Sequence, residues 1–333
     1  MATPSIILGF IYRQLFVTPP EPKEDYTGQT VIVTGANVGL GLETARTITR
    51  LGAAKVIITS RSSEKGEAAK EDIEKTTGRT GIVDVWSLDL CSYDSVKAFA
   101  ARAATLPRLD AVIENAGVAF HHWEWAEDAE ITIKTNVIST FLLAFLLLPT
   151  LKRSANTHNT LGHLTIVSSE VHFFTSFPER KTSGSIFAHL ADKDKARMMD
   201  RYNVSKLLEV LTVRHLAQDP ALPSNKDNKD YPVVINTVNP GFCYSNLRRN
   251  MGQSIFIDLF EKALARTEEV GSRSFVYAAQ AGRESHGQYI SDSKITPPSK
   301  LVQSQEGQVL HDRVWGELKD ILESIVPGVT NNV

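Results

Sequence analysis

The segment QTVIVTGANVGLGLE, residues 29–43, combines a short apolar run, three glycines and the start of a helical pattern. The run 31–33 is β-branched throughout, as suits a central strand of a parallel sheet that is buried on both faces. Where this strand turns into a helix, the glycines are Gly35, Gly39 and Gly41. Glycine permits positive φ and lets backbone N–H groups approach a phosphate at a helix N-terminus. Glycines also mark ordinary turns, so the rest of the chain must decide between a phosphate site and a simple turn.

Composition and charge restrict the class of protein. The chain has 333 residues, of which 42% are hydrophobic and 22% charged, so it can bury a large core. This length fits one α/β domain with insertions. A net charge of −2 gives no electrostatic footprint for nucleic acid or for an anionic membrane. With only Cys91 and Cys243, a reducing compartment such as the cytoplasm is expected rather than a disulfide framework.

Residues 1–26 are expected to form an extension ahead of a domain that covers 27–333. The apolar run 6–17, IILGFIYRQLFV, contains Arg13 and Gln14 and is shorter than the ~20 residues that span a membrane. No basic segment precedes it and no small-residue cleavage site follows, so a signal peptide is not expected. The run predicts a helix docked on the domain surface, and a peripheral membrane or partner contact is the alternative.

The glycines are spaced Gly-x-x-x-Gly-x-Gly and follow Thr34, unlike the commoner Gly-x-Gly-x-x-Gly of dinucleotide-binding proteins. This spacing resembles that of the short-chain dehydrogenase/reductase family. The resemblance implies a single Rossmann-type, doubly wound parallel sheet of about seven strands flanked by helices. It also implies that the turn contacts the cofactor through Gly35, Asn37, Val38, Gly39, Leu40 and Gly41.

The next two strands are expected to meet the adenosine half of the cofactor. After strand 55–59, an acidic residue would indicate NAD, whereas a basic one accommodates the 2′-phosphate of NADP. The sequence has Arg61 and then Lys65, which favours NADP(H), although both cations could simply solvate a helix start. After strand 82–88 come Asp89 and Leu90, and the resemblance implies that Asp89 bonds the adenine. An Asp can equally cap a turn.

The fourth strand, 109–113, leads into Glu114-Asn115-Ala116-Gly117, where the resembled family has Asn-Asn-Ala-Gly. The resemblance implies that Asn115, Ala116 and Gly117 lie against the cofactor ribose, with Asn115 tying this strand to its neighbour. Asn136 precedes a strongly apolar helix that could serve the core or a homodimer interface. It matches the family's Asn that connects the active-site lysine to solvent through a water, and the alternative is an Asn bonded within its own helix.

Four residues are expected to be catalytic: Asn136, introduced above, and Ser169, Tyr202 and Lys206. Strand 162–169 ends in two serines, and the resemblance selects the second, whose side chain should face away from that of Ser168. Tyr202 and Lys206 are four residues apart on a predicted helix and therefore share a face. A phenol with a pKa near 10 is a poor acid or base at neutral pH, so Lys206 is expected to lower the pKa of Tyr202. The resemblance also places Tyr202 and Lys206 in contact with the cofactor.

Two other patterns are not assigned to the site. Tyr93 and Lys97 show the same Tyr-x-x-x-Lys spacing, but they lie too early in the chain, on the adenine side of the sheet. His121, His122 and Glu124 lack the fixed geometry of a metal site, so no metal is expected.

The remaining segments are expected to shape the substrate site. Insertion 170–200 should form one wall, and 242–266 should form a lid. Pro240, Gly241 and Ser245 should complete the nicotinamide pocket. Because the insertion and the lid are rich in apolar residues, they predict a lipophilic substrate.

Together these patterns predict an NADP(H)-dependent ketoreductase or alcohol dehydrogenase acting on a lipophilic small molecule. The insertion and the N-terminal extension resemble the retinol-dehydrogenase-like branch and fungal secondary-metabolism reductases. Two alternatives stay open: a non-redox isomerase, dehydratase or cyclase on the same scaffold, and a binding module that senses NADP(H). No nucleic-acid partner and no transmembrane span are expected.

Overall fold

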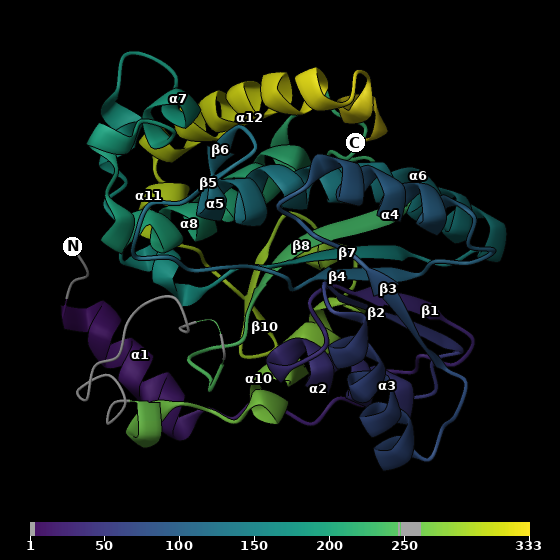
Figure 1. Cartoon of the computed structure of the whole chain (residues 1–333). Helices are drawn as coiled ribbons and strands as arrows, with labels where there is room; N and C mark the ends of the chain where they lie inside the picture. Colours follow the sequence, from purple (N-terminus) through teal and green to yellow (C-terminus); the bar gives the residue numbers. More distant parts are fainter. Residues whose placement is uncertain (1–3, 246, 248–260) are drawn as a thin grey trace.

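A mostly parallel sheet forms the centre of the computed structural model, which describes residues 4–245, 247 and 261–333. Its strand order is β10-β9-β8-β7-β4-β1-β2-β3 (Figure 1). Every neighbouring pair is parallel except β9 and β10. The predicted doubly wound sheet is therefore confirmed. The strands of the parallel part are β1 (Thr30–Val33), β2 (Lys55–Ser60), β3 (Val83–Ser87), β4 (Ala111–Glu114), β7 (Gly162–Val167), β8 (Val233–Asn239) and β9 (Tyr289–Ser291).

One strand of the central sheet was not expected from the sequence. β10 (Lys294–Thr296) pairs antiparallel with β9 at the edge of the sheet. The two strands are joined by Asp292 and Ser293, whose φ angles are both positive, at 53° and 57°. Positive φ at both central residues is the geometry of a tight hairpin turn, which neither residue type signals as clearly as glycine does.

Helices cover both faces of the sheet (Figure 1). One layer consists of α2 (Gly39–Arg50), α3 (Ser63–Thr77) and α10 (Glu268–Ala278). The other consists of α4 (Tyr93–Ala104), α6 (Thr140–His158), α8 (Met198–Gln218) and α12 (Gln305–Ile325). β1 contributes to both cores, because Val31 and Val33 belong to one buried cluster and Ile32 to the other. The β-branched run was thus correctly predicted to be buried on both faces.

Short elements complete the fold. Between β4 and β7 lie β5 (Trp125–Ala126), β6 (Ala129–Glu130), α5 (Ile131–Ile133) and the π-helix η1 (Lys134–Ser139). The insertion contains η2 (Glu170–Phe173), η3 (Pro178–Lys181), α7 (Ile186–Leu190) and η4 (Lys193–Lys195). Towards the C-terminus lie η6 (Arg283–Ser285), α11 (Lys300–Gln303) and η7 (Val329–Asn332).

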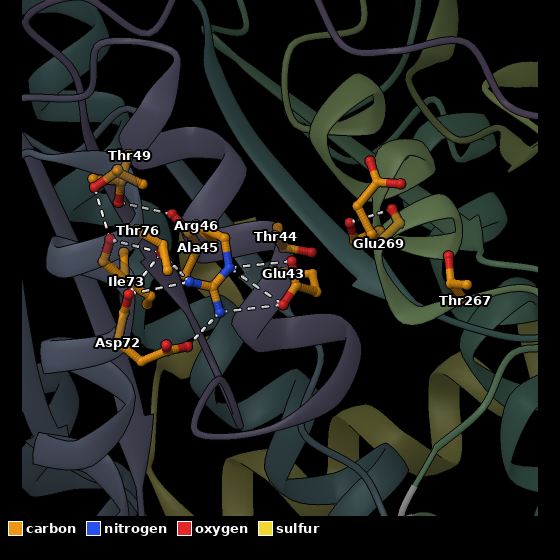
Figure 2. Close-up of polar contacts among 12 residues, drawn as sticks. Glu43, Thr44, Ala45, Arg46, Thr49, Asp72, Ile73, Thr76, Thr267 and Glu269 are labelled. Carbon is orange, nitrogen blue, oxygen red and sulfur yellow. Dashed lines mark hydrogen bonds and ion pairs between the residues drawn. The ribbon is translucent and has the colours of Figure 1, made fainter.

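Arg46 joins the two helices that follow the first two strands. Its guanidinium pairs with Glu43 within α2 at 3.2 Å and with Asp72 of α3 at 2.6 Å. It also donates to the hydroxyl of Thr76 (Figure 2). These contacts hold α2, which starts inside the glycine turn, against α3. α2 begins at Gly39, so the last two glycines of the turn form part of its first turn.

Within the described ranges, a single helical stretch, Ile131–His158, is long and apolar enough to cross a membrane. However, 89% of its apolar window is buried inside the protein. This degree of burial is that of a core helix, which was one of the two roles expected for the segment after Asn136.

The N-terminal helix α1 (Pro4–Phe16) is docked on the domain, as predicted (Figure 1). Gln14 makes three hydrogen bonds with distant backbone. Its Nε2 donates to the carbonyls of Phe242 and Leu264, both at 2.8 Å, and its Oε1 accepts from the N–H of Phe242 at 3.1 Å. Arg266 Nη2 donates to the carbonyls of Arg13 and Val17 at 3.0 and 2.8 Å. The outer face of α1 is apolar and exposed.

Replacing Gln14 with alanine is expected to loosen α1. The change removes three hydrogen bonds that are partly buried, each with a net value of about 1 kcal/mol, so local opening should become at least about tenfold more frequent. Hydrogen–deuterium exchange of the α1 amides would measure this. Gln308→Ala, at an exposed position of α12, is the matched control. Equal exchange in α1 for the two variants would contradict the docking role of Gln14.

Candidate active site

The glycine turn is packed tightly against the end of β4. Gly35 has a φ of +62°, and a Cβ on it would lie 3.0 Å from the Cα of Ala116. A Cβ on Gly41 would lie 2.6 Å from Asn115 Nδ2 and 2.7 Å from the Gly35 carbonyl. Asn115 Nδ2 donates to the carbonyls of Thr34 and Gly35 at 2.9 and 3.1 Å. Asn115 therefore ties β4 to the turn after β1, as expected.

The start of α2 has the features of a phosphate site. Val38 is its N-cap residue, is exposed and makes no side-chain capping bond. Gly39 has a φ of +65°, and a Cβ there would approach nothing closer than Glu268 Oε1 at 3.5 Å. The first N–H groups of the helix thus lack a side-chain cap, and the absence of a Cβ at Gly39 leaves the backbone accessible there, whereas Gly41 is buried and permits close packing within the turn. These residues fit the pyrophosphate of a dinucleotide.

The residues predicted for the adenosine half follow β2 and β3. Arg61 and Lys65 are exposed, and neither side chain makes a hydrogen bond or ion pair with the rest of the described chain. Asp89 caps a turn, since its Oδ1 accepts from the N–H of Cys91 at 3.0 Å. Leu90 is a buried member of the core, so only its backbone could face a ligand.

Ser169, Tyr202 and Lys206 meet at the carboxyl end of β7. Lys206 Nζ lies 5.7 Å from the centre of the Tyr202 ring. The Ser169 hydroxyl lies close enough to the phenol of Tyr202 to lower the pKa of that phenol. Ser168 is buried and faces the other way, where its Oγ donates to the Lys206 carbonyl at 2.9 Å. Ser168 and Ser169 thus have different partners, as the alternation of side chains along the strand predicted, whereas the choice of Ser169 as the catalytic serine stays a prediction.

The pKa of Tyr202 differs from the expectation. Burial raises it, and the negative charge of Glu209 adds to this, while the Lys206 ammonium and the Ser169 hydroxyl lower it. The net result is a pKa above the ordinary value of a tyrosine. The lysine acts in the expected direction, but desolvation of the phenolate outweighs it in the protein alone.

Lys206 has a charged partner that was not predicted. Its Nζ donates to the Val167 carbonyl at 2.8 Å and to Glu209 Oε1 at 2.7 Å. Burial lowers the pKa of Lys206, but the charges of Glu209 and Tyr202 outweigh it, so the pKa lies above its usual value. Glu209 is three residues beyond Lys206 on α8, a spacing that places the two side chains side by side. That spacing was the available signal.

Asn136 links two distant segments rather than bonding within its own helix. Its Oδ1 accepts from the Val118 N–H, and its Nδ2 donates to the Val118 carbonyl, both at 2.9 Å. Nδ2 also donates to Ser205 Oγ at 3.0 Å. Asn136 therefore holds the loop after Gly117 against α8, and both of its amide hydrogens are occupied. The alternative of a locally bonded Asn is wrong.

The two patterns that were set aside have other partners. Tyr93 donates its hydroxyl to Asp128 Oδ1 at 2.9 Å, and Lys97 pairs with Asp94 at 2.7 Å. Tyr93 lies at the start of α4, and neither of these contacts involves Ser169, Tyr202 or Lys206. His122 Nε2 lies 2.7 Å from Glu124 Oε1. Across the part of the chain that is described, no three His, Cys, Asp or Glu side chains are grouped as metal ligands.

The insertion 170–200 packs against α8 through η2 and against the C-terminal helix α12 through residues 180–187. Arg180 pairs with Glu306 at 2.7 Å, and Arg313 donates to carbonyls of the insertion. Only its first turn, η2, lies beside Ser169. There a cavity of about 250 Å³ lies between α1, η2 and β9. Its lining includes Arg13, Glu170, Phe173 and Tyr289. Ser169, Tyr202 and Lys206 are not among the residues that line this cavity, so the wall expected from the insertion stays a prediction. Arg180, Ser185 and Phe187 of the insertion contact α12.

The segment expected to close the site is only partly described. Pro240 and Gly241 follow β8 directly, and a Cβ on Gly241 would lie 2.7 Å from Arg266 Nη1 and 2.8 Å from Gln14 Oε1. Ser245 is described, whereas residues 246 and 248–260 of the expected lid lie outside the described residues.

The sheet and the glycine turn define a doubly wound α/β protein of the dinucleotide-binding class. A profile of the family described as short chain dehydrogenase matches residues 29–178. The short chain dehydrogenase/reductase dmxR8 of Cryptosporiopsis sp. (strain 8999) is 49% identical over 330 residues, which cover 98% of this chain and 100% of that protein. The short-chain dehydrogenase anuD of Penicillium roqueforti (strain FM164) is 44% identical, covering 97% and 84%. The chain therefore belongs to the short-chain dehydrogenase/reductase family of oxidoreductases.

Solved structures share the fold. The NADPH-bound carbonyl reductase from chicken fatty liver superimposes with a TM-score of 0.59 at 19% identity, covering 81% of this chain and 99% of that one. The short chain dehydrogenase from Shigella flexneri gives a TM-score of 0.58 at 23% identity, covering 84% and 96%. At these identities the likeness concerns the fold alone.

Proposed function

We propose that the protein is an NADP(H)-dependent oxidoreductase that interconverts a carbonyl and an alcohol on a lipophilic small molecule of secondary metabolism. The observation that carries this proposal is the grouping of Ser169, Tyr202 and Lys206 at the carboxyl end of β7. The glycine turn follows β1 at the same edge of the sheet, with only β4 between these two strands. Ligands of open parallel sheets bind at this edge.

Each residue of the group has a role that follows from its chemistry. A bound nicotinamide would supply or accept the hydride. Ser169 would hydrogen-bond the substrate oxygen, and Tyr202 would give its phenolic proton to that oxygen in reduction or take it in oxidation. Lys206 favours the phenolate through its charge. Asn136 holds the loop after Gly117 in place, and the cavity lined by Phe173 and Tyr289 would receive an apolar part of the substrate.

The test is a purified-protein assay against lipophilic ketones, aldehydes and enones with NADPH and with NADH. We expect NADPH to be consumed in step with alcohol formation. Product formed without cofactor consumption would instead indicate an isomerase, dehydratase or cyclase. Tight NADPH binding without turnover on any substrate would indicate a binding module. A homodimer and a cytoplasmic location stay predictions.

Arg61→Ala is expected to reduce the preference for NADPH over NADH. A hydrogen bond to a charged group contributes about 1.5–3 kcal/mol, so the ratio of kcat/KM for the two cofactors should fall at least about tenfold. NADH kinetics should change little, because NADH lacks the 2′-phosphate. Lys70→Ala, on the following helix, serves as the control for loss of a surface cation. An unchanged ratio in Arg61→Ala would contradict the assignment of Arg61 to the 2′-phosphate.

A further inference from the structure

Two buried carboxyl groups form a chain that starts at Lys206, and the proposed reaction uses neither: Glu209 contacts Lys206, and Glu114 interacts with Glu209. Glu209 on α8 is 1% exposed, and its Oε1 accepts from Lys206 Nζ at 2.7 Å. Glu114 is the last residue of β4 and is 4% exposed. Alternate residues of a strand share a face, so Glu114 points to the same side as Val112, whose core cluster includes Leu207 and Leu208 of α8. Glu114 therefore faces the helix that carries Glu209.

The hydrogen bonding of this pair is incomplete. Both carboxyl oxygens of Glu114 and the second oxygen of Glu209 have no hydrogen-bond partner in the described part of the chain. An ionised carboxylate that is buried without partners is very costly, and such groups take up a proton instead. Two neighbouring carboxyl groups with one cation beside them are best balanced when they hold one proton between them.

Burial and contacts indicate where that proton resides. Burial and the charge of Glu209 raise the pKa of Glu114 well above its ordinary value. Burial also raises the pKa of Glu209, to about 7, although contact with Lys206 opposes this. Glu209 has the ammonium next to it and Glu114 does not. Above neutral pH, Glu209 is therefore the ionised member and Glu114 the neutral one.

We propose that Glu209 and Glu114 are positioning residues for Lys206. The two carboxyl groups share one proton and so keep a single negative charge beside the ammonium. This charge orients Lys206 Nζ and sets the pH range in which Tyr202 releases its proton. The inference rests on the proposed function, because it concerns the proton that Tyr202 exchanges with the substrate. Neither carboxyl group is assigned contact with the substrate.

The charged surroundings of Glu209 are few. The charged or titratable groups near Glu209 are Lys206 and Tyr202 on α8 and Glu114 on the sheet. The neutral hydroxyl of Ser168 also lies beside Glu209. Arg214 on α8 and His311 on α12 have side-chain nitrogens without a hydrogen-bond partner in the described part of the chain, and Arg214 acts on His311 rather than on Glu209. Other charged side chains on α8 and on the elements packed against it have partners of their own. These are Lys134 with Glu127, Glu170 with Arg13, Arg201 with Glu130 and His215 with Asp312. The titration of the pair is therefore coupled mainly to Lys206 and Tyr202.

The test compares Glu209→Gln with Glu114→Gln. Removing one negative charge from a coupled cluster makes every group in it easier to deprotonate. The profile of kcat/KM against pH for alcohol oxidation by Glu209→Gln should therefore move to lower pH by about one unit. At a given pH on the rising part of the profile, kcat/KM should then be about tenfold higher than in wild type. Glu114→Gln replaces a group that is already neutral, so its profile should stay at the wild-type position. Glu209→Asp keeps the charge and should restore the wild-type position even where kcat is reduced.

A second readout needs no turnover. Infrared difference spectra of the cofactor-free protein, wild type minus Glu114→Gln, should contain the carbonyl band of a neutral carboxylic acid above neutral pH. Wild type minus Glu209→Gln should instead show carboxylate bands. Three results would each overturn the inference. They are a pH profile of Glu209→Gln that coincides with that of wild type, an equal shift in Glu114→Gln, and a neutral-acid band assigned to Glu209. Failure of the proposed function is distinct, since wild-type protein would then show no turnover while the infrared result still stood.

Discussion

Tyr202→Phe is expected to lower kcat for carbonyl reduction by about 10²–10⁴-fold. The change removes the phenolic oxygen and leaves the ring, so packing at the start of α8 is preserved and only the group that exchanges the proton is lost. Because Lys206 is bonded to Val167 and Glu209, its position does not depend on the Tyr202 hydroxyl. NADPH affinity should therefore change little. Steady-state kinetics with NADPH and equilibrium binding of NADPH would measure the two effects separately.

Tyr93→Phe is the matched control for this experiment. Tyr93 belongs to the other Tyr-x-x-x-Lys sequence in the chain, and its hydroxyl is bonded to Asp128 rather than directed at Lys206. The control should keep wild-type kcat. Full carbonyl reductase activity in Tyr202→Phe, or an equal loss in Tyr93→Phe, would refute the proposed mechanism.

Gly41→Ala is expected to abolish high-affinity NADPH binding and to lower the free energy of unfolding by about 1–3 kcal/mol. The added Cβ would lie 2.6 Å from Asn115 Nδ2, 2.7 Å from the Gly35 carbonyl and 2.9 Å from the Ala36 Cα. Two of these three atoms belong to the backbone of the turn itself, so the turn must move to make room. Moving it also breaks the bonds by which Asn115 holds β4 to this segment. Fluorescence titration with NADPH and urea denaturation would measure the two losses.

Gly316→Ala controls for the general effect of replacing a helical glycine. Gly316 is exposed on α12, and an added Cβ there would meet no atom within 4 Å. Alanine should stabilise that helix by up to about 1 kcal/mol and leave NADPH binding intact. If Gly41→Ala behaved like this control, the glycine turn would not have the close packing assigned to it.

Some features of this protein are encoded by residues that are close together in the sequence. The glycine turn was predictable because a strand, three glycines and a helix follow one another within 15 residues. Tyr202 and Lys206 could be paired because four residues on a helix share a face. Tyr93 and Lys97 have the same spacing, and only their place in the order of strands excluded them. Spacing and strand order are both properties of the chain itself.

Other features depend on segments that are far apart in the sequence. Glu114 and Glu209 are separated by 95 positions in the numbering, and they face each other only because α8 packs on the face of the sheet to which Glu114 points. Arg180, Ser185 and Phe187 of the insertion contact α12, more than 120 residues away in the sequence. Gln14 contacts Phe242 and Leu264 across more than 220 residues. No local pattern encodes such contacts.

By itself, the sequence determined the buried strand β1, the glycine turn and the helical spacing of Tyr202 and Lys206, because periodicity and spacing act over a few turns of chain. The doubly wound sheet and the order of the residues along the site followed from the resemblance to the family. The tertiary structure decided the pKa of Tyr202 and the charges that surround Lys206. Whether Lys206 lowers the pKa of Tyr202 depends on how deeply both groups are buried and on which other charges are buried with them. Burial raises the pKa of Tyr202, and Glu209 supplies a charge beside Lys206 that the family pattern did not predict. Desolvation depends on everything that surrounds a group, and that is defined only when the distant parts of the chain have come together.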